Sequence, residues 1–331
     1  MKLLLTSNGL SNDVIAQALE DLTGKPRAET KVAFVPTAAL SPDQGKADSK
    51  DWFARDIHRI SKYAGFLDVV SLADLDPAES LRRLGSADVL FFSGGNTFYL
   101  SYWMAKTGLF AVLPKLLSTR VYAGISAGSM VATPTLRTAS QAVKNLDKFY
   151  DSDYDEVGPK GASSGEAAGL TDFVIRPHFG SHVFPQIKGD FLADIARDVK
   201  IPLYAIDDQS AVVVDGKRVD VVSEGTWRVY NKTISSADFV RRYERRGLTA
   251  ETGLDQPHTR YEPHAHAKRY LGTVAGSLDI RLSGGEWQKL LPGQELVVGA
   301  GQLHEALAGP DGWEYVAAWD SGESDANDHL L

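Results

Sequence analysis

The sequence predicts an α/β domain with a mainly parallel sheet between helices, followed by a small all-β domain. In roughly the first two thirds of the chain, short apolar runs alternate with segments that have helical spacing. Several runs are apolar at every position, which is typical of strands buried on both faces of a parallel sheet. After about residue 247 the helical pattern ends, and short strand-like runs are separated by glycine-rich turns.

The strands expected in the first domain share a high content of apolar and β-branched residues: 2–7, 31–37, 67–72, 88–95, 121–126, 172–178 and 203–207. Helices are expected between most of them, at 51–65, 79–87 and 97–117. In the first of these, Trp52, Ile57 and Ile60 recur at helical spacing, and Gly65 ends the pattern. This alternation predicts strand–helix–strand units with parallel pairing.

The later part of the chain is expected to be organised differently. A hairpin is predicted at 210–231, with its turn at Asp215-Gly216, and a charged helix ends at Gly247. We therefore expect four regions: an α/β domain at 1–232, a linker helix and loop at 233–254, a small β-barrel domain at 255–320 and a tail at 321–331.

The composition excludes several classes of binding partner and of catalytic residue. The 331 residues carry a net charge of −8, which argues against nucleic acid or an anionic membrane as the main partner. The absence of cysteine excludes disulfides, a thiolate metal site and a cysteine nucleophile. Residues 1–13 are too polar for a signal peptide, and no apolar run approaches about 18 residues. We expect a cytoplasmic protein.

The segment VYAGISAGSM places Ser126 where an apolar strand meets a helix. Gly124-x-Ser126-x-Gly128 fits a nucleophile elbow, in which a tight turn strains the serine backbone and exposes its hydroxyl. The backbone N–H of Ala127 would then stabilise an oxyanion. The alternative is a small-residue turn without catalytic function.

A second glycine-rich loop, Gly94-Gly95-Asn96, follows the strand at 88–95. At the carboxyl end of a parallel strand, such a loop lines the ligand site, so Gly94 and Asn96 are candidate substrate-binding residues. The N–H of Gly95 is the candidate second oxyanion donor. The alternatives are a phosphate-binding loop or a helix cap formed by Asn96.

The candidate general base is His178. It is one of eight histidines and follows the strand at 172–178, at another carboxyl end. On position alone it is the histidine best placed to reach Ser126.

These segments resemble the peptidase E (aspartyl dipeptidase) family, over residues 1–230. The resemblance rests on FFSGGNTFYL, on GISAGSM followed by PTLRT, on RPHFG and on YAIDDQSAVVVDG. It implies a fold similar to class I glutamine amidotransferases and a serine peptidase that acts on small peptides and needs no cofactor for hydrolysis. Ser126 would be the nucleophile and His178 the base, with Gly95 and Ala127 in the oxyanion hole.

Two departures from the family pattern stand out. The family's acidic triad member corresponds here to Gln141, which could hold the imidazole by a hydrogen bond but would not stabilise its cation as a carboxylate does; Asp147 or Asp208 could replace it. The family's basic residue for an aspartyl substrate lies beyond the histidine, where this chain offers only Lys188. Specificity for Asp-Xaa dipeptides is therefore not predicted.

The late β region contains His264-x-His266 and, after a glycine turn, His304. Residues two apart on a strand point the same way, so both imidazoles could meet one divalent transition metal together with His304. The pattern resembles the cupin family, in which Arg269 stands here at the place of a metal-binding glutamate. The alternative is a metal-free pocket used for a ligand or for packing in a homodimer.

Two functions follow from these patterns. The first is a serine hydrolase of small peptides with a cupin-like domain attached. The second is a catalytically weakened binding or sensor protein whose function resides in the cupin-like domain.

Overall fold

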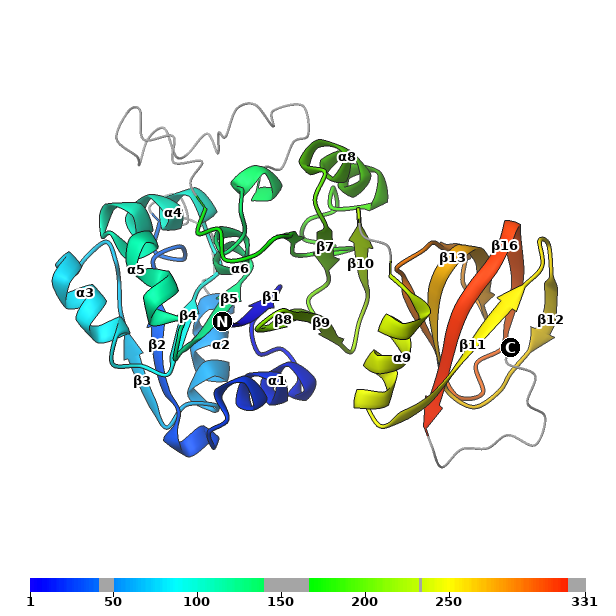
Figure 1. Cartoon of the computed structure of the whole chain (residues 1–331), viewed down its shortest axis with the longest axis horizontal. Coiled ribbons are helices and arrows are strands. Elements are labelled where there is room, and N and C mark those ends of the chain that lie inside the picture. Colours follow the sequence, from blue (N-terminus) through cyan, green and yellow to red (C-terminus); the bar gives the residue numbers. More distant parts are fainter. Residues whose placement is uncertain (42–50, 140–166, 232–233, 321–331) are drawn as a thin grey trace. The chain divides into compact units, whose positions relative to one another are not determined.

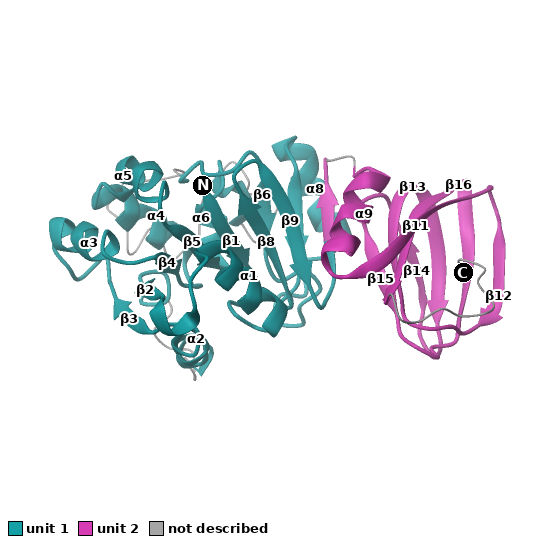
Figure 2. Cartoon of the chain, turned by 60° about the horizontal axis from the view of Figure 1, so that its bottom comes forward, with its two compact units in different colours: residues 1–227 teal, residues 228–331 magenta. Residues whose placement is uncertain are grey.

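A computed structural model describes residues 1–41, 51–139, 167–231 and 234–320. The chain divides into two compact units, Met1–Trp227 and Arg228–Leu331, which are coloured separately in Figure 2. Each unit is described here by itself.

The first unit is built on a seven-stranded sheet with the order β3-β2-β4-β5-β1-β8-β9. The five strands from β3 to β1 pair in parallel, β8 pairs antiparallel with β1, and β9 pairs antiparallel with β8 (Figure 1). The prediction of a mainly parallel sheet is therefore confirmed. The strands have the following bounds: β1 Lys2–Thr6, β2 Lys31–Val35, β3 Phe66–Val69, β4 Val89–Phe92, β5 Val121–Ile125, β8 Ser210–Asp215 and β9 Arg218–Ser223.

Both faces of this sheet are covered, which explains why its strands are apolar at consecutive positions. On one face, Phe34 and Phe91 pack with Leu19 of α1 (Asp13–Thr23) and Ile60 of α2 (Asp51–Ser61). On the other face, the Tyr122 hydroxyl donates a 2.6 Å hydrogen bond to the Gly128 carbonyl of α6 (Ala127–Val131). The core therefore lies on both sides of the central strands.

A second, smaller sheet of the first unit pairs β6 (Val174–Arg176) in parallel with β7 (Leu203–Ile206). The helix predicted at 97–117 is two helices, because the backbone of Gly108 is left-handed (φ 72°) and interrupts the pattern. The remaining helices have the following bounds: η1 Arg27–Glu29, α3 Pro77–Leu84, α4 Thr97–Lys106, α5 Leu109–Leu116, η3 Leu136–Ala139 and α8 Gly189–Val199.

The second unit is all-β apart from α9 (Ser236–Arg245), as predicted. Its antiparallel sheet has the order β11-β16-β13-β14, with β12 beside β16 and β15 beside β13. Leu271, Ile280 and Trp313 are fully buried in its core. The strands are β11 Leu248–Asp255, β12 Arg260–His264, β13 Arg269–Leu282, β14 Trp287–Leu290, β15 Glu295–Val298 and β16 His304–Asp320, while β10 (Trp227–Tyr230) begins at the end of the first unit.

The structure differs from the expected linker at 233–254. Leu248–Asp255 is not a loop but strand β11, which pairs with β16 from Leu248↔Asp320 to Asp255↔Trp313. It lies at the end of the strand order, so much of it is solvent-exposed and polar residues are tolerated. Without strict alternation of apolar and polar residues, its sequence lacks the usual strand pattern.

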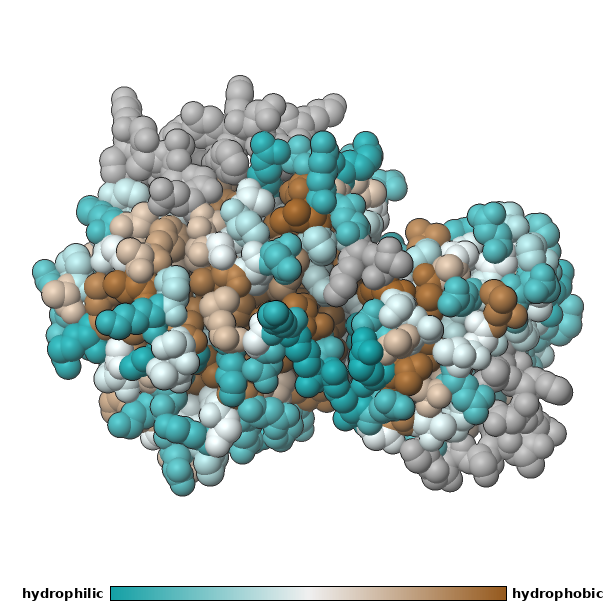
Figure 3. Space-filling model, in the orientation of Figure 1, coloured by the Kyte–Doolittle hydropathy of each residue, from teal (hydrophilic) through white to brown (hydrophobic). Residues whose placement is uncertain are grey.

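Among the described residues, no helix combines the length and apolarity needed to cross a membrane. On the face shown in Figure 3, apolar side chains of both units lie between hydrophilic ones. The parallel strands of the first unit give it an α/β architecture. In this architecture, loops at the carboxyl ends of the strands form the site.

Candidate active site

Ser126 lies in the sharp turn between β5 and α6. Its backbone has φ 45° and ψ −100°, outside the regions that most residues adopt. The Ser126 N–H donates to the Thr6 carbonyl over 3.0 Å, and the Ser126 carbonyl accepts from the Met130 N–H over 2.9 Å. This is the strained strand–turn–helix geometry expected of a nucleophile elbow.

The two flanking glycines are required by close backbone contacts. A Cβ atom added to Gly124 would lie 2.5 Å from the carbonyl carbon of Gly128. A Cβ atom added to Gly128 would lie 2.4 Å from the carbonyl oxygen of Phe92. Because real Cβ atoms do not approach backbone so closely, only glycine fits at either position.

His178 links Ser126 to a carboxylate. Its Nε2 lies 2.9 Å from the Ser126 Oγ, and its Nδ1 lies 2.8 Å from an Asp208 carboxylate oxygen. His178 lies two residues after the end of β6, and Asp208 lies two residues after the end of the neighbouring strand β7. The imidazole also stacks on the Phe184 ring, with centroids 4.6 Å apart. Serine, histidine and aspartate therefore form one hydrogen-bonded chain.

Ser7, a residue that the sequence interpretation missed, supports this chain from the end of β1. Its hydroxyl donates to the Asp208 carboxylate over 2.6 Å and accepts from the backbone N–H of His178 over 2.9 Å. Burial raises the pKa of Asp208, but hydrogen bonds from His178 and Ser7 outweigh it and hold that pKa below its usual range. The carboxylate is thus kept ionised beside the imidazole.

The neighbouring Asp207 has a different task. Its carboxylate accepts from the Gln209 N–H over 3.0 Å and from the Ser210 hydroxyl over 2.6 Å, and so closes the turn between β7 and β8. This turn directs Asp208 toward His178. The other two acid-position candidates, Gln141 and Asp147, lie outside the described residues.

The loop between β4 and α4 brings Gly94 and Gly95 to the serine. A Cβ added to Gly94 would lie 3.6 Å from the Ser126 Cβ. Gly95 has φ 128°, and a Cβ there would lie 2.2 Å from the Ala38 carbonyl oxygen. Within the described ranges, the backbone N–H groups of Gly95 and Ala127 have no hydrogen-bond partner, so both can serve an oxyanion.

Asn96 caps helix α4. Its amide oxygen accepts from the Tyr99 N–H over 2.9 Å, and its side chain is buried. This is the capping arrangement that the sequence left open as an alternative to substrate binding. Asn96 nevertheless lies at the wall of the cavity described next.

A cavity of about 480 Å³ opens beside the serine. The residues predicted from the sequence that line it are Gly94, Gly95, Asn96, Ser126, His178 and Asp208. It is also lined by charged and aromatic side chains that the sequence interpretation did not single out for this site: Trp52, Arg55, Asp56, Arg176 and Phe184. Lys188 is not among the lining residues, so the cations of this cavity come from other segments.

Arg176 is the more buried of the two arginines. Only 4% of it is exposed, and burial lowers its pKa to about 10. One guanidinium nitrogen donates to the Thr138 carbonyl, while Nε has no hydrogen-bond partner. A buried guanidinium with an unused donor favours an anionic group in the cavity.

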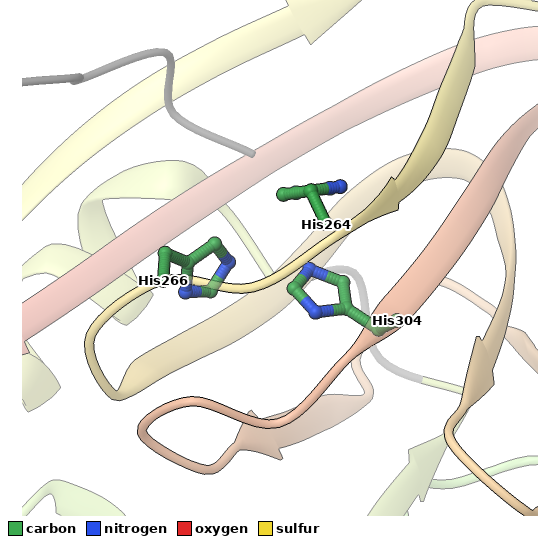
Figure 4. A group of neighbouring side chains, drawn as sticks. All are labelled: His264, His266 and His304. Atoms are coloured by element: carbon green, nitrogen blue, oxygen red, sulfur yellow. The ribbon is translucent and has the colours of Figure 1, made fainter.

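In the second unit, three imidazoles converge as predicted (Figure 4). Ring centroids lie 4.3 Å apart for His264 and His304 and 4.6 Å apart for His266 and His304. One potential ligand nitrogen from each ring lies within 4.8 Å of the others. Only His264 belongs to β12, and His266 lies in the connection to β13, so the two do not share one strand as expected.

Hydrogen bonds fix how these rings present their nitrogens. Each Nδ1 lies 2.6–2.9 Å from a backbone carbonyl, which only accepts, so each Nδ1 carries the proton. Within the described part of the chain, the Nε2 atoms of His264 and His304 are buried, have no hydrogen-bond partner and retain their lone pairs. Burial and the neighbouring His264 and His266 also lower the pKa of His304. Arg269 is buried, with its guanidinium 4.9 Å from the Trp319 ring centroid.

The fold agrees with comparisons to known proteins. Peptidase E of Streptomyces coelicolor is 30% identical over 240 residues, which cover 70% of this chain and 88% of the relative. Peptidase E of Nostoc sp. is 24% identical, over 62% of this chain and 74% of the relative. The crystal structure of a peptidase from an acI-B1 Actinobacterium matches 70% of this chain and 91% of its own, with a TM-score of 0.50 and 20% identity.

The family model described as Peptidase family S51 matches residues 3–222, which is more than half of the chain. Nearly all of the first unit, including every residue of the hydrogen-bonded chain around Ser126, lies within this match. The chain therefore belongs to peptidase family S51 and is a serine peptidase.

Proposed function

We propose that this protein hydrolyses small peptides, as a dipeptidase or exopeptidase, with Ser126, His178 and Asp208 as its catalytic triad. The observation that carries the proposal is the pair of consecutive hydrogen bonds, 2.9 Å from His178 Nε2 to Ser126 and 2.8 Å from His178 Nδ1 to Asp208. This is the geometry in which a base activates a hydroxyl and is itself held by a carboxylate.

The reaction follows from these positions. Ser126 Oγ attacks the peptide carbonyl carbon while its proton passes to His178 Nε2. The resulting imidazolium is stabilised by Asp208, and it returns the proton to the leaving amine as the C–N bond breaks. Water then attacks the acyl-enzyme by the same route and releases the acid and free Ser126.

The negative charge of the tetrahedral intermediate meets two backbone donors. The proposed donors are the N–H groups of Gly95, which follows the Gly94 that contacts Ser126, and of Ala127, the first residue of α6. Donors of this kind stabilise charge that develops only in the transition state, commonly by about 3 kcal/mol each.

The size of the cavity supports short substrates. Its volume of about 480 Å³ lies in the range of small-molecule sites, about 300–1,000 Å³. Arg55 and Arg176 in its wall would attract a carboxylate, either a side chain or the carboxyl end of a dipeptide. Specificity for acidic residues can thus be supplied from positions other than the one expected beyond His178.

The proposal is tested with a serine-directed fluorophosphonate and dipeptide hydrolysis. Ser126→Ala is expected to abolish both, whereas Ser118→Ala, an exposed serine at the end of α5, retains both. Asp208→Asn is expected to lose activity, and Gln141→Asp to gain none. If Gln141→Asp raised the rate and Asp208→Asn left it unchanged, the third triad member would be assigned wrongly.

A second function is supported by the histidine cluster. We propose that His264, His266 and His304 hold a divalent transition metal through Nε2. Three imidazoles whose potential ligand atoms lie within 4.8 Å of one another, each oriented by a hydrogen bond from Nδ1, have the donor set and support of a metal site. Three histidines leave a coordination position for water or a ligand.

Elemental analysis of untagged protein tests this site. About one equivalent of metal is expected in the wild type and little in His304→Ala. His258→Asn serves as the control, because His258 is exposed in the same unit and asparagine tolerates its left-handed backbone (φ 63°). Less than about a tenth of an equivalent in the wild type after loading would make the cluster a metal-free pocket.

A further inference from the structure

The aromatic ring of Phe184 covers one face of the His178 imidazole. The two ring centroids lie 4.6 Å apart and the ring planes are inclined by 27°, so the rings are stacked. The edge of the imidazole is used by Ser126 at Nε2 and by Asp208 at Nδ1. Phe184 therefore contacts His178 on a face, at right angles to the hydrogen bonds that link it to the serine and the aspartate.

The loop that carries Phe184 is closed by its own backbone hydrogen bonds. The Phe184 carbonyl accepts from the Ile187 N–H over 3.0 Å, which forms a turn with Pro185 at its second position, where proline is favoured. The Gly180 N–H donates to the Ile187 carbonyl over 3.2 Å. Ile187 is only 1% exposed, so this end of the loop is anchored. These contacts bring Phe184 back over His178.

An aromatic face attracts cations, and in the proposed reaction His178 becomes a cation when Ser126 attacks. The face of a phenyl ring carries negative charge, so it stabilises an imidazolium more than a neutral imidazole. Only an interaction that is stronger in the transition state than in the ground state raises the rate of the chemical step. The stacked ring would therefore act on kcat rather than on KM.

We propose that Phe184 is a positioning residue whose ring face holds the His178 imidazole and stabilises its protonated form while Ser126 is acylated. The inference rests on the proposed triad and deepens it. Asp208 stabilises the imidazolium in the plane of the ring, at Nδ1, and Phe184 does so from the face. The His178 side chain is only 19% exposed, so water screens this attraction little, and we expect it to contribute about tenfold to the rate.

The test changes the charge of the ring face while it keeps the shape of the ring. Fluorine withdraws electron density from an aromatic face, so monofluorinated, difluorinated and trifluorinated phenylalanine are incorporated in place of Phe184 in the full chain. The rate at which a fluorophosphonate labels Ser126 is expected to fall stepwise along this series, by about fivefold or more for the trifluorinated form. In dipeptide hydrolysis, kcat should fall in the same order while KM changes little.

Two substitutions and a second phenylalanine provide the controls. Phe184→Leu keeps an apolar side chain without the aromatic face and should label about tenfold more slowly, and Phe184→Tyr should restore most of that loss. Trifluorinated phenylalanine in place of Phe173 should leave the labelling rate unchanged, because that ring packs against Tyr204 and does not line the cavity. The melting temperature of each fluorinated form checks that the first unit remains folded.

Failure of the inference differs from failure of the proposed function. Equal labelling rates across the fluorinated series, with or without a loss in Phe184→Leu, would reduce Phe184 to a packing residue and overturn the inference. A rise of KM at constant kcat would make it only a wall of the substrate cavity and would also overturn it. Absence of labelling and hydrolysis in the wild type would instead refute the proposed function.

Discussion

Replacing Asp56 with asparagine should stabilise the first unit. Burial raises the pKa of this carboxyl from 3.8 to about 6. Each pKa unit corresponds to about 1.4 kcal/mol, so ionised Asp56 lowers the free energy of unfolding by about 3 kcal/mol at pH 8. Asparagine has nearly the same shape and remains neutral at every pH, so the variant avoids this loss.

The sign of the pH dependence follows from proton binding. Below pH 3.8 the carboxyl is protonated in both the folded and the unfolded state, and Asp56 has no linked effect. Between pH 3.8 and about 6 the folded state retains the proton that the unfolded state releases, so stability falls as pH rises. The advantage of Asp56→Asn should therefore grow from about 1 kcal/mol at pH 4.5 to about 3 kcal/mol at pH 8.

Native-state hydrogen exchange measures this difference within one unit. The slowest amides of β1 and β5 are expected to report unfolding of the first unit. Relative to the wild type, their protection in Asp56→Asn should increase about fivefold at pH 4.5 and about 150-fold at pH 8. Any constant effect of the amide group cancels between the two pH values. An equal change at both pH values would refute the assignment of Asp56 as a buried, unpaired carboxylate.

Four further outcomes are expected. Asp208→Asn should lower kcat by about 10³-fold or more in dipeptide hydrolysis, with KM little changed. Ser7→Ala should lower kcat by about tenfold, because its hydrogen bonds to Asp208 and to the His178 backbone are lost. Gly124→Ala should abolish fluorophosphonate labelling, because the added methyl would lie 2.5 Å from the Gly128 backbone. Chelation should lower the melting temperature of the second unit without changing the rate at which Ser126 is labelled, as calorimetry and gel fluorescence would show.

The nucleophile turn was predictable because its requirements are local. Gly124 is needed by a backbone contact with Gly128 inside the turn, so this part of the pattern carries the geometry directly, whereas Gly128 is needed by the Phe92 carbonyl of the neighbouring strand β4. His178 could be chosen by its place after a strand. Each prediction needs only one strand and its following loop, together with the rule that loops after parallel strands line a site.

The partners of these residues were harder to predict because they depend on tertiary structure. Asp207 and Asp208 are adjacent in sequence, and only the turn that Asp207 closes determines which of them meets the histidine. Ser7 comes from the opposite end of the first unit's sequence. Asp56 lies in a helix whose apolar spacing drew attention to Ile57 and Ile60 instead.

The second unit shows the same limit. Strand β11 was predicted as a loop, since Glu251 and Thr252 lie on an edge strand that is partly exposed and needs no apolar alternation. The three histidines converge as predicted, but β12 is irregular between Tyr261 and His264, and His266 lies beyond its end rather than on the same strand face. The spacing of the histidines in the sequence thus predicted that they cluster, although the backbone between His264 and His266 is not the strand that was expected.

The two candidate sites share a physical feature that packing alone does not explain. In the described part of the chain, Asp56 Oδ1 in the first unit and the Nε2 atoms of His264 and His304 in the second are buried without hydrogen-bond partners. Buried polar atoms are normally paired, because each unpaired one lowers stability by about 1–3 kcal/mol. Neutral imidazole nitrogens with lone pairs are the ligands that a transition metal accepts. The chemistry of the histidine cluster therefore supports the metal ion that we propose as its ligand.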